Sequence, residues 1–203
     1  MDTVIVLGNI SIIDLDDLKN KYIIGVEKGA LKLIELGYKP DLSIGDFDSC
    51  NTFDISIIKE NSKEFIKLNP IKDLTDTEEA ILKAKGNILI LGGIKGKRIE
   101  HFYANIKLLE KYKNIIMKDE NSKIYIKEES FSLTNEYKYI SLFSLTNESN
   151  ISIKGMKYNL DNYILRSDNP TLGISNEYIN DGYVTINSGK LLVFESKEDH
   201  ENL

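Results

Sequence analysis

The feature that most constrains the fold of this chain is an alternation of short apolar segments with helical segments over about the first 120 residues. Apolar runs of this length, bounded by Gly, Pro, Asp or Asn, indicate buried strands. Strands that alternate with helices pair in parallel, because each helix must cross back over the sheet. We expect strands at residues 4–8, 22–26, 41–44, 64–68, 87–91 and 114–118, and helices at 30–36, 53–59, from Thr75 onward, and at 99–111.

The pattern changes after residue 120. The segments there are short, rich in β-branched and aromatic residues, and separated by Asn, Asp, Ser and Gly, which is typical of an antiparallel sandwich or barrel. The chain is therefore predicted to have a mostly parallel α/β domain at residues 1–120 and an antiparallel β-sandwich or barrel at 121–203. The β-segments are expected at 124–126, 131–133, 137–145, 151–153, 163–166, 182–186 and 190–194.

Composition and charge argue against several classes of protein. The 203 residues are 41% hydrophobic and 29% charged, which is ordinary for a globular chain with a buried core. A formal net charge of −6 argues against a nucleic-acid binder, and no apolar run approaches the length of a membrane span. Cys50 is the only cysteine and the first residues lack a signal-peptide pattern, so we expect a cytoplasmic protein without disulfides.

Two carboxylates, Asp46 and Asp48, follow the third expected strand in the run Gly45-Asp46-Phe47-Asp48-Ser49. The carboxyl edge of an open α/β sheet is where ligands bind. Asp-x-Asp on an extended backbone directs both side chains to one side, which suits a divalent cation that carries phosphates. The alternative is a solvated acidic turn, since Asp, Gly and Ser are ordinary turn residues.

A second acidic pair, Asp73 and Asp76, lies at the start of the next expected helix. Thr75 and Glu78 have the spacing of a capping box, and acidic residues near a helix N-terminus are favoured by its dipole. Asp76 therefore has a structural interpretation, whereas Asp73 lies before the cap. Both carboxylates can also face a cation at the sheet edge, and neither interpretation excludes the other.

A loop with three glycines and three cations, residues 92–98, follows the fifth expected strand. Its backbone amides and basic side chains can hold a triphosphate, although it lacks the Gly-Lys-Ser/Thr ending of a Walker loop. In the next helix, His101 and Asn105 are four residues apart and share one face. The alternatives are a plain connection for the loop and a structural role for His101.

Several segments, taken together and in this order, resemble the thiamine pyrophosphokinase family in its bacterial form. The resemblance runs from about residue 22 to the C-terminus. The matching segments are Gly25-Val26-Glu27-Lys28-Gly29-Ala30, Pro40 to Ser49, Lys72-Asp73-Leu74-Thr75-Asp76, Gly92 to Asn105, Gly155 to Leu160 and Thr171 to Glu177.

The resemblance implies an enzyme that transfers the pyrophosphoryl group of ATP to the hydroxyl of thiamine, giving thiamine diphosphate and AMP. It implies Mg²⁺ as the cofactor and a homodimer. It also implies a Rossmann-like α/β domain at residues 1–120 that binds ATP and Mg²⁺, followed by an antiparallel β-sandwich at 121–203 that binds thiamine. Thiamine carries a positive ring, which suits an acidic pocket with aromatic side chains such as Tyr178.

Site residues carry over from the resemblance by position. The implied catalytic residues are the metal-binding aspartates and Arg98, and Ser175 and Asn176 are implied in the thiamine pocket. The implied metal ligands are Glu27, Asp46, Asp48, Asp73 and Asp76. The residues implied to lie at the nucleotide are Ser49, Lys72, Arg98, His101 and Asn105.

Three positions depart from the family pattern. Glu27 and Glu100 stand where the family usually has Asp, and Lys97 replaces a usual glycine. Each Glu keeps the charge but adds a methylene, which matters for tight Mg²⁺ geometry. We expect these changes to shift the position or affinity of the metal without abolishing the reaction.

Two other functions fit parts of the pattern. A pyrophosphokinase of the same fold acting on another hydroxymethyl heterocycle, such as a pterin, is one; the segment Ser175-Asn176-Glu177 favours thiamine over it. The other is a catalytically silent regulator that binds nucleotide or thiamine, with Glu27 and Glu100 as marks of lost activity. Ligand binding without release of AMP would indicate the regulator.

Overall fold

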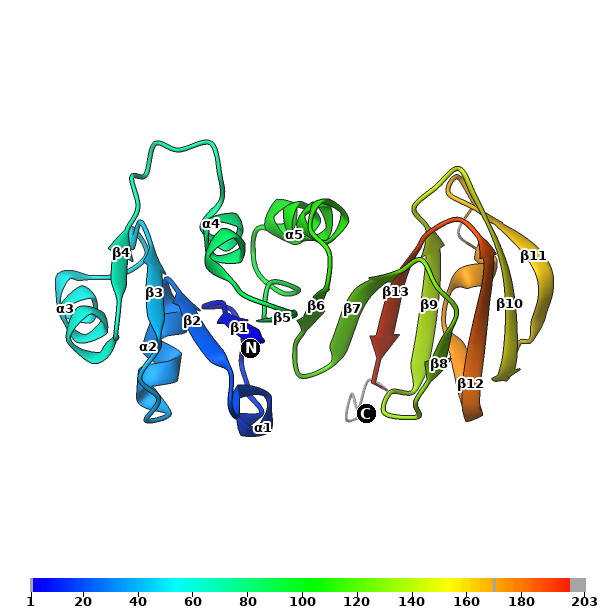
Figure 1. Cartoon of the computed structure of the whole chain (residues 1–203), viewed down its shortest axis with the longest axis horizontal. Helices are drawn as coiled ribbons and strands as arrows, with labels where there is room; N and C mark the ends of the chain where they lie inside the picture. Colours follow the sequence, from blue (N-terminus) through cyan, green and yellow to red (C-terminus); the bar gives the residue numbers. More distant parts are fainter. Residues whose placement is uncertain (1, 170, 198–203) are drawn as a thin grey trace. The chain divides into compact units, whose positions relative to one another are not determined.

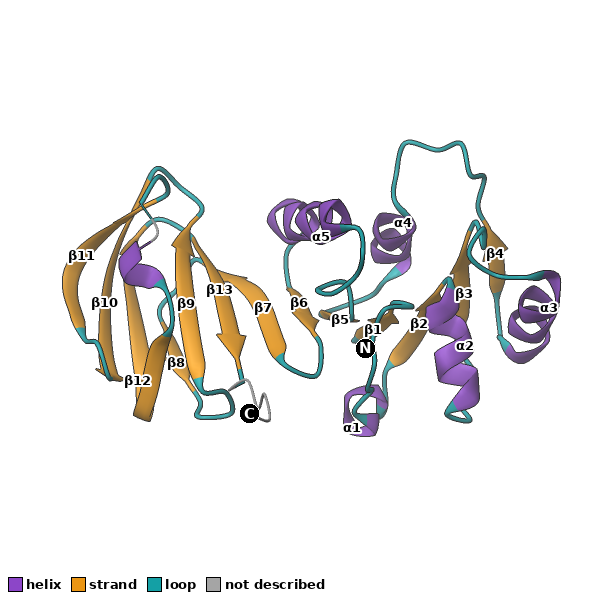
Figure 2. Ribbon diagram, turned by 180° about the vertical axis from the view of Figure 1, so that it is seen from behind, coloured by secondary structure: helices purple, strands orange, loops and turns teal. Residues whose placement is uncertain are grey.

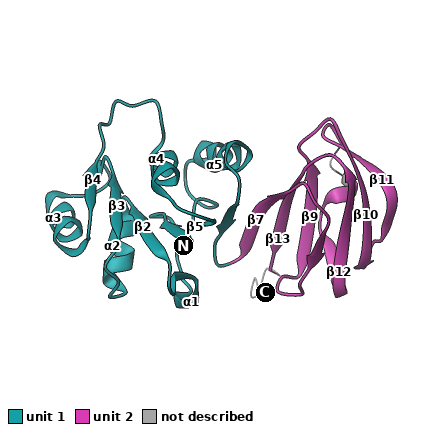
Figure 3. Ribbon diagram, viewed as in Figure 1, with its two compact units in different colours: residues 1–120 teal, residues 121–203 magenta. Residues whose placement is uncertain are grey.

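The computed structural model describes residues 2–169 and 171–197. The chain divides into two compact units, residues 1–120 and residues 121–203, which we call the α/β unit and the β unit (Figure 3). Helices α1 to α5 all belong to the first unit, and the second is built mainly of strands. No helix in the described ranges is long and apolar enough to cross a membrane.

The α/β unit is built on a parallel sheet with the strand order β4-β3-β2-β1-β5-β6. The chain runs outward from β1 to β4 and then returns to the other side of β1 with β5, so the strand order reverses between β1 and β5. The parallel pairing predicted from the alternation is confirmed. The strands are β1 (Thr3–Val6), β2 (Tyr22–Val26), β3 (Leu42–Gly45), β4 (Phe65–Lys67), β5 (Ile88–Leu91) and β6 (Ile115–Lys118).

Helices cover both faces of this sheet. Figure 1 shows α1 and α2 on one face and α4 and α5 on the other. This division follows from right-handed crossovers, because the direction of travel along the sheet reverses after β4. The helices are α1 (Leu15–Leu18), α2 (Lys28–Glu35), α3 (Thr52–Asn61), α4 (Asp76–Lys83) and α5 (Ile99–Lys111). The single turn of α1 was not predicted, because four residues are too few to show a helical period.

The central strands are hydrophobic because they are covered on both faces. Strands β1 and β3 are buried at every position, and Leu33 of α2 packs with Val4 and Val6 in one apolar cluster. Burying a side chain of this size contributes roughly 1.5–3 kcal/mol. Gly29 lets α2 approach the sheet closely, because a Cβ at this position would overlap the carbonyl oxygen of Val6.

The start of α4 differs in part from the predicted capping box. The Thr75 side chain accepts a hydrogen bond from the Glu78 N–H at 3.1 Å, as expected of an N-cap. The Glu78 carboxylate, however, accepts hydrogen bonds from Lys111 Nζ at 2.6 Å and Tyr112 OH at 2.8 Å. Glu78 therefore connects α4 to the end of α5, and both of these donors lower the pKa of its carboxyl.

The β unit is antiparallel throughout its described strand pairs (Figure 2). Alternate side chains of β9 are buried, as expected for a strand with one face on a core. The predicted β-rich second part of the chain is confirmed. Its strands are β7 (Ser122–Lys127), β8 (Phe131–Leu133), β9 (Tyr139–Ser144), β10 (Glu148–Met156), β11 (Leu160–Arg166), β12 (Asn176–Ser188) and β13 (Leu191–Ser196), with a 3₁₀ turn at Thr171–Gly173.

Strand β12 is much longer than the predicted segment at residues 182–186. Its first residues, Asn176 and Glu177, pair with β9, whereas its second half pairs with β10 and β8. The polar residues Asn180 and Asp181 in its middle are exposed, so they break the apolar pattern without breaking the strand. Strand β12 therefore pairs with β9 at its start and with β10 and β8 along the rest of its length.

Candidate active site

Three carboxylates from separate elements meet at the carboxyl edge of the parallel sheet. Glu27 follows β2, Asp46 follows β3, and Asp76 is the first residue of α4. One carboxylate oxygen from each of the three lies within 4.8 Å of the other two, and all three residues are half-buried. We call these three residues the carboxylate cluster. Oxygen donors at this spacing suit a hard divalent cation such as Mg²⁺.

Glu27 is held in the cluster by an unusual backbone and by two hydrogen bonds. Its φ of 53° and ψ of −128° are rare for a residue other than glycine, and such strain costs roughly 1–3 kcal/mol. Its carboxylate accepts hydrogen bonds from the Phe47 N–H at 2.5 Å and from Ser49 Oγ at 2.9 Å. Burial raises the pKa of Glu27 despite these two donors. A Cβ at Gly45 would overlap the Glu27 carboxylate, so this approach requires glycine.

Lys72 supplies the positive charge of the site. Its Nζ lies 3.2 Å from Asp46 Oδ2 and 2.9 Å from Asp76 Oδ1, and its side chain is only 15% exposed. Burial alone would raise the pKa of Asp46, but the Asp48 N–H and Lys72 together hold it below its ordinary value. Three carboxylates facing one ammonium group leave an excess of negative charge, so the cluster favours a further cation.

The surroundings of Asp76 Oδ1 bear on whether a cation fits at the cluster. It is buried, and Lys72 Nζ lies 2.9 Å from it. A buried carboxylate oxygen is costly unless a cation, a donor or water satisfies it, and here one ammonium group is shared between Asp76 and Asp46. Glu27, Asp46 and Asp76 therefore have the donor atoms and the excess of negative charge that suit Mg²⁺.

Asp48 and Asp73 are predicted ligands that lie outside the cluster. Both are exposed, and neither belongs to the group of oxygens described above. The expectation that Asp46 and Asp48 point to one side assumed an extended backbone. Phe47 instead has a φ of 58° and buries its ring against Phe65 at a centroid distance of 4.9 Å, so the chain turns between the two aspartates. Asp48 contributes its N–H to Asp46 Oδ1 at 3.1 Å.

The predicted residues of the glycine loop and of the following helix differ in burial: Arg98 and His101 are exposed, whereas Asn105 is buried. Arg98 is exposed and pairs with Glu100 at 2.7 Å, and Lys95 pairs with Glu120 at 2.7 Å. His101 is exposed on α5. Asn105 is buried and donates from Nδ2 to the Gly93 carbonyl at 3.1 Å, so it supports the loop from beneath.

Asn9 is a contact residue of the same loop that sequence reasoning did not identify. Its side-chain oxygen accepts a hydrogen bond from the Gly93 N–H at 2.8 Å, and its amide nitrogen donates to the Lys95 carbonyl. Asn9 lies after the end of β1, in a Gly-Asn pair. Its position beyond a strand end was the one available signal, and a lone Asn in a turn is too common to stand out.

Ser175 and Asn176 lie in the β unit. Ser175 is exposed, has a φ of 54° and donates its N–H to Ser141 Oγ at 3.0 Å. Asn176 is buried, donates from Nδ2 to the Tyr158 carbonyl at 2.7 Å and accepts from the Tyr158 N–H at 3.0 Å. The Asn176 amide therefore fixes the turn between β10 and β11.

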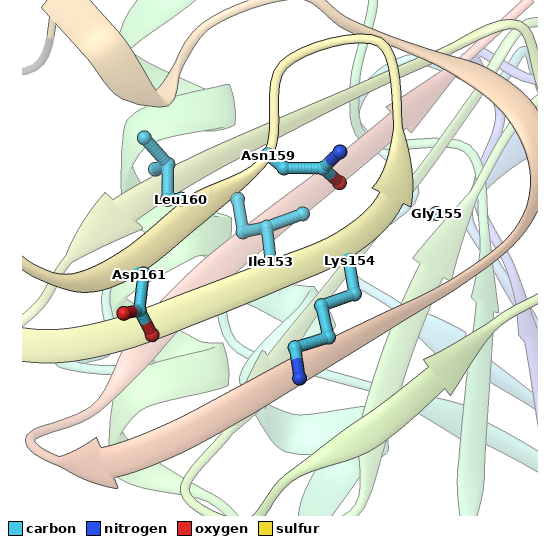
Figure 4. Close-up of a pocket in the computed structure, with 6 residues that line it drawn as sticks. All are labelled: Ile153, Lys154, Gly155, Asn159, Leu160 and Asp161. Carbon is cyan, nitrogen blue, oxygen red and sulfur yellow. The ribbon is translucent and has the colours of Figure 1, made fainter.

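A shallow hollow of about 440 Å³ lies along that same hairpin. Figure 4 shows the Lys154 and Asp161 side chains on its two strands, with Asn159 at the turn. None of the predicted site residues lines it. Its lining residues are Ile153, Lys154, Gly155, Asn159, Leu160 and Asp161.

Two family models together match most of the chain. Residues 18–126 match the model described as "Thiamin pyrophosphokinase, catalytic domain". Residues 121–193 match the model described as "Thiamin pyrophosphokinase, vitamin B1 binding domain". The first match contains the carboxylate cluster and the glycine loop, and the second contains Ser175 and Asn176.

Individual relatives agree with the family models. A thiamine pyrophosphokinase of Bacillus subtilis is 29% identical over 187 residues, which are 86% of this chain and 87% of the relative. A crystal structure of a thiamin pyrophosphokinase family protein from Enterococcus faecalis has a TM-score of 0.86 and 25% identity, covering 98% of this chain and all of that one. The crystal structure of the Bacillus subtilis protein has a TM-score of 0.83 and 28% identity, covering 97% and 99%.

Proposed function

The chain belongs to the thiamin pyrophosphokinase family, whose enzymes transfer the pyrophosphoryl group of ATP to thiamine, and we propose that it does so at its carboxylate cluster. The products are thiamine diphosphate and AMP. The observation that carries the proposal is the meeting of Glu27, Asp46 and Asp76 within 4.8 Å at the carboxyl edge of the sheet. That edge is the ligand-binding edge of open α/β sheets.

In this proposal, Glu27, Asp46 and Asp76 hold the Mg²⁺ that accompanies ATP. The chemistry supplied by a bound Mg²⁺ is neutralisation of the triphosphate and of the charge that develops on the leaving AMP. Glu27 is fixed by Phe47 and Ser49, so its oxygens are already in place before substrate arrives. Transfers of this kind depend mainly on positioning and electrostatics, which fixed ligands provide.

The remaining cations and loop amides are proposed to hold the phosphates. Lys72 already lies at the cluster, and Arg98 and the glycine loop follow β5, a neighbour of β1 in the same sheet. Ser49, His101 and Asn105 complete the proposed nucleotide site, Asn105 through the loop that it supports. Asp48 and Asp73 are proposed to join when substrate is present, since both are exposed beside cluster residues.

The proposal assigns the β unit, with Ser175 and Asn176, to thiamine. It also describes the first unit as Rossmann-like, because of its strand order and crossovers. It describes the second unit as a β-sandwich, because β12 pairs with β9 at one end and with β10 along the rest of its length. It further includes a homodimer and a cytoplasmic location, the latter in keeping with a single free cysteine.

The test is formation of AMP from ATP and Mg²⁺ by the purified chain, with and without thiamine. We expect AMP and thiamine diphosphate in equal amounts, and turnover reduced roughly 100-fold by Asp46→Asn or Asp76→Asn. Glu60→Gln, at an exposed position of α3, is the matched control and should leave turnover unchanged. Asp48→Asn and Asp73→Asn show whether the two exposed aspartates also take part.

Two results would overturn parts of the proposal. Full turnover in both Asp46→Asn and Asp76→Asn would remove the carboxylate cluster from the mechanism. Binding of thiamine without thiamine-dependent AMP would replace the enzyme with a thiamine-binding regulator.

A further inference from the structure

We propose that Asn9 is a positioning residue that shapes the glycine loop, residues 92–98, to receive the phosphates of ATP. This inference rests on the proposed function for the identity of the ligand. The loop follows β5 and Asn9 follows β1, and these two strands are neighbours at the point where the strand order reverses. In open α/β sheets, the carboxyl edge at such a reversal is where nucleotides bind.

One Asn9 side chain uses both halves of its amide on this loop. Its oxygen accepts from the Gly93 N–H at 2.8 Å, and its nitrogen donates to the Lys95 carbonyl. The two contacts lie two residues apart in the loop, so they fix the path of the chain between Gly93 and Lys95. An amide does both tasks without charge, whereas a carboxylate in its place would accept only and would repel phosphate.

Asn105 fixes the same loop from the other side. It is 6% exposed and donates to the Gly93 carbonyl at 3.1 Å, while the Gly92 N–H donates to the Lys118 carbonyl at 2.9 Å. Together with Asn9, these contacts hold the N–H and the carbonyl of Gly93. They determine which way the neighbouring peptide groups face.

The two glycines are required by this arrangement. Gly92 and Gly93 have φ values of 97° and 81°, a region that other residues rarely occupy. A Cβ on Gly92 would lie 2.8 Å from Asn9 Oδ1, and a Cβ on Gly93 would lie 2.6 Å from Asn105 Nδ2. The loop is therefore packed against both asparagine side chains.

The cations of the loop show why its path matters. Lys95 and Arg98 are directed to Glu120 and Glu100, each at 2.7 Å. Asn9 donates a hydrogen bond to the Lys95 carbonyl and so fixes the backbone at this residue. It thereby sets the positions from which the side chains of Lys95 and Lys97 extend. A loop without this contact keeps its charges but no longer presents them in one arrangement, which weakens binding of an extended polyphosphate.

Three measurements on Asn9→Ala and Asn9→Asp test the inference. The first is hydrogen exchange of the Gly93 amide, which should become faster in Asn9→Ala. The second is the affinity for the non-hydrolysable analogue AMPCPP with Mg²⁺, measured by calorimetry. It should fall about tenfold in both variants, which corresponds to about 1.4 kcal/mol of binding free energy. The third is steady-state kinetics, in which KM for ATP should rise about tenfold while KM for thiamine changes less than about twofold.

The control is Asn61→Ala, because exposed Asn61 also donates to a backbone carbonyl, that of Ile57, at 2.9 Å. It should leave all three measurements unchanged. Asn9 variants with wild-type AMPCPP affinity would overturn the inference. An equal rise of KM for ATP and KM for thiamine, together with a lower unfolding midpoint, would also overturn it. If the wild type binds AMPCPP and Asn9→Ala does not, but no AMP forms, the inference stands and the proposed reaction fails. No AMPCPP binding by the wild type would overturn both.

Discussion

At the scale of single residues, Lys72 is the side chain on which the carboxylate cluster most depends. Its ammonium group lies within 3.2 Å of Asp46 and 2.9 Å of Asp76. These two carboxylates raise the pKa of Lys72 above its ordinary value, although burial acts in the opposite direction. The half-buried carboxylates would repel one another without this cation.

Replacement of Lys72 should make the fold depend on added metal. We expect Lys72→Met to lower the unfolding temperature without Mg²⁺, and millimolar Mg²⁺ to restore more of it than in the wild type, because the cation replaces the lost ammonium group. Thermal unfolding with and without Mg²⁺ measures this. Lys59→Met, at an exposed position of α3, is the control. An identical Mg²⁺ effect in wild type and Lys72→Met would contradict the prediction.

At the scale of elements, α4 and α5 are connected through a buried carboxylate. Glu78 is 8% exposed and accepts hydrogen bonds from Lys111 and Tyr112 at the end of α5. We expect Glu78→Gln to lower the free energy of unfolding by roughly 1–3 kcal/mol, because two donors lose a charged acceptor. Urea unfolding at pH 7 measures this, with Glu79→Gln on the same helix as control. Equal stability of the two variants would show that this connection is worth little.

A second connection joins β12 to β13 in the β unit. Tyr178 donates from its hydroxyl to Glu195 at 2.9 Å, and Lys123 lies 3.0 Å from the other oxygen of this buried carboxylate. Burial, followed by the charge of Glu195, raises the pKa of Tyr178 far above its ordinary value. Tyr125 is shifted in the same direction for the same reasons.

These shifts predict a loss of stability in alkali. A tyrosine whose pKa is raised by folding keeps its proton in the folded state after the unfolded chain has lost it at about pH 10. Stability is therefore complete below pH 10 and falls as pH rises above it. We expect Tyr178→Phe to lessen this fall, measured as urea midpoints at pH 8 and pH 11. Tyr183→Phe, at an exposed position, is the control, and parallel pH curves for all three proteins would refute the idea.

Secondary structure was predictable where a periodic pattern is long enough to see. Helix α5 and strand β2 have the predicted bounds, because their apolar residues repeat without interruption. The turn of α1 and the first half of β12 were missed, because one is too short and the other is interrupted by Asn180 and Asp181. Long-range contacts such as Glu78 with Lys111 leave no trace in local spacing.

The sequence indicated that acidic side chains gather at the strand ends, but not which of them meet. Acidic residues at strand ends led us to predict a cation site, and the structure brings Glu27, Asp46 and Asp76 together at the carboxyl edge of the sheet. Asp48 is turned away by the positive φ of Phe47, which no residue pattern indicates. Asn9 acts across a gap of 84 residues, so only the folded sheet brings it to Gly93.

At the scale of the whole molecule, the β unit carries several exposed apolar side chains close together in sequence. Leu172, Ile174 and Ile179 are 61%, 47% and 62% exposed, and Tyr158 is 58% exposed. A contiguous patch of exposed apolar side chains marks a surface that binds other proteins, whereas scattered ones are ordinary. In the proposed homodimer, we expect a second copy to cover these side chains.

Light scattering after size exclusion tests this prediction. We expect twice the chain mass of 23.1 kDa for the wild type and a shift toward the single-chain mass for Ile174→Lys or Ile179→Glu. Charges placed in an apolar contact are costly to bury, whereas Ile12→Lys in the α/β unit should change nothing. A wild-type mass of 23.1 kDa at high concentration would rule the homodimer out.

The strained backbone of Glu27 has an evolutionary consequence. Selection for a stable fold and selection for turnover favour different residues at this position, because glycine would relieve a φ of 53° while removing a carboxylate from the cluster. In a library randomised at position 27 and sorted for folded protein after heating, Glu27→Gly should be enriched. Sorting the same library for thiamine diphosphate should retain Glu or Asp. Depletion of Glu27→Gly in the first sort would show that the bonds to Phe47 and Ser49 outweigh the strain. A descendant of this chain freed from catalysis should therefore lose its acid here first, and grow more stable as it does.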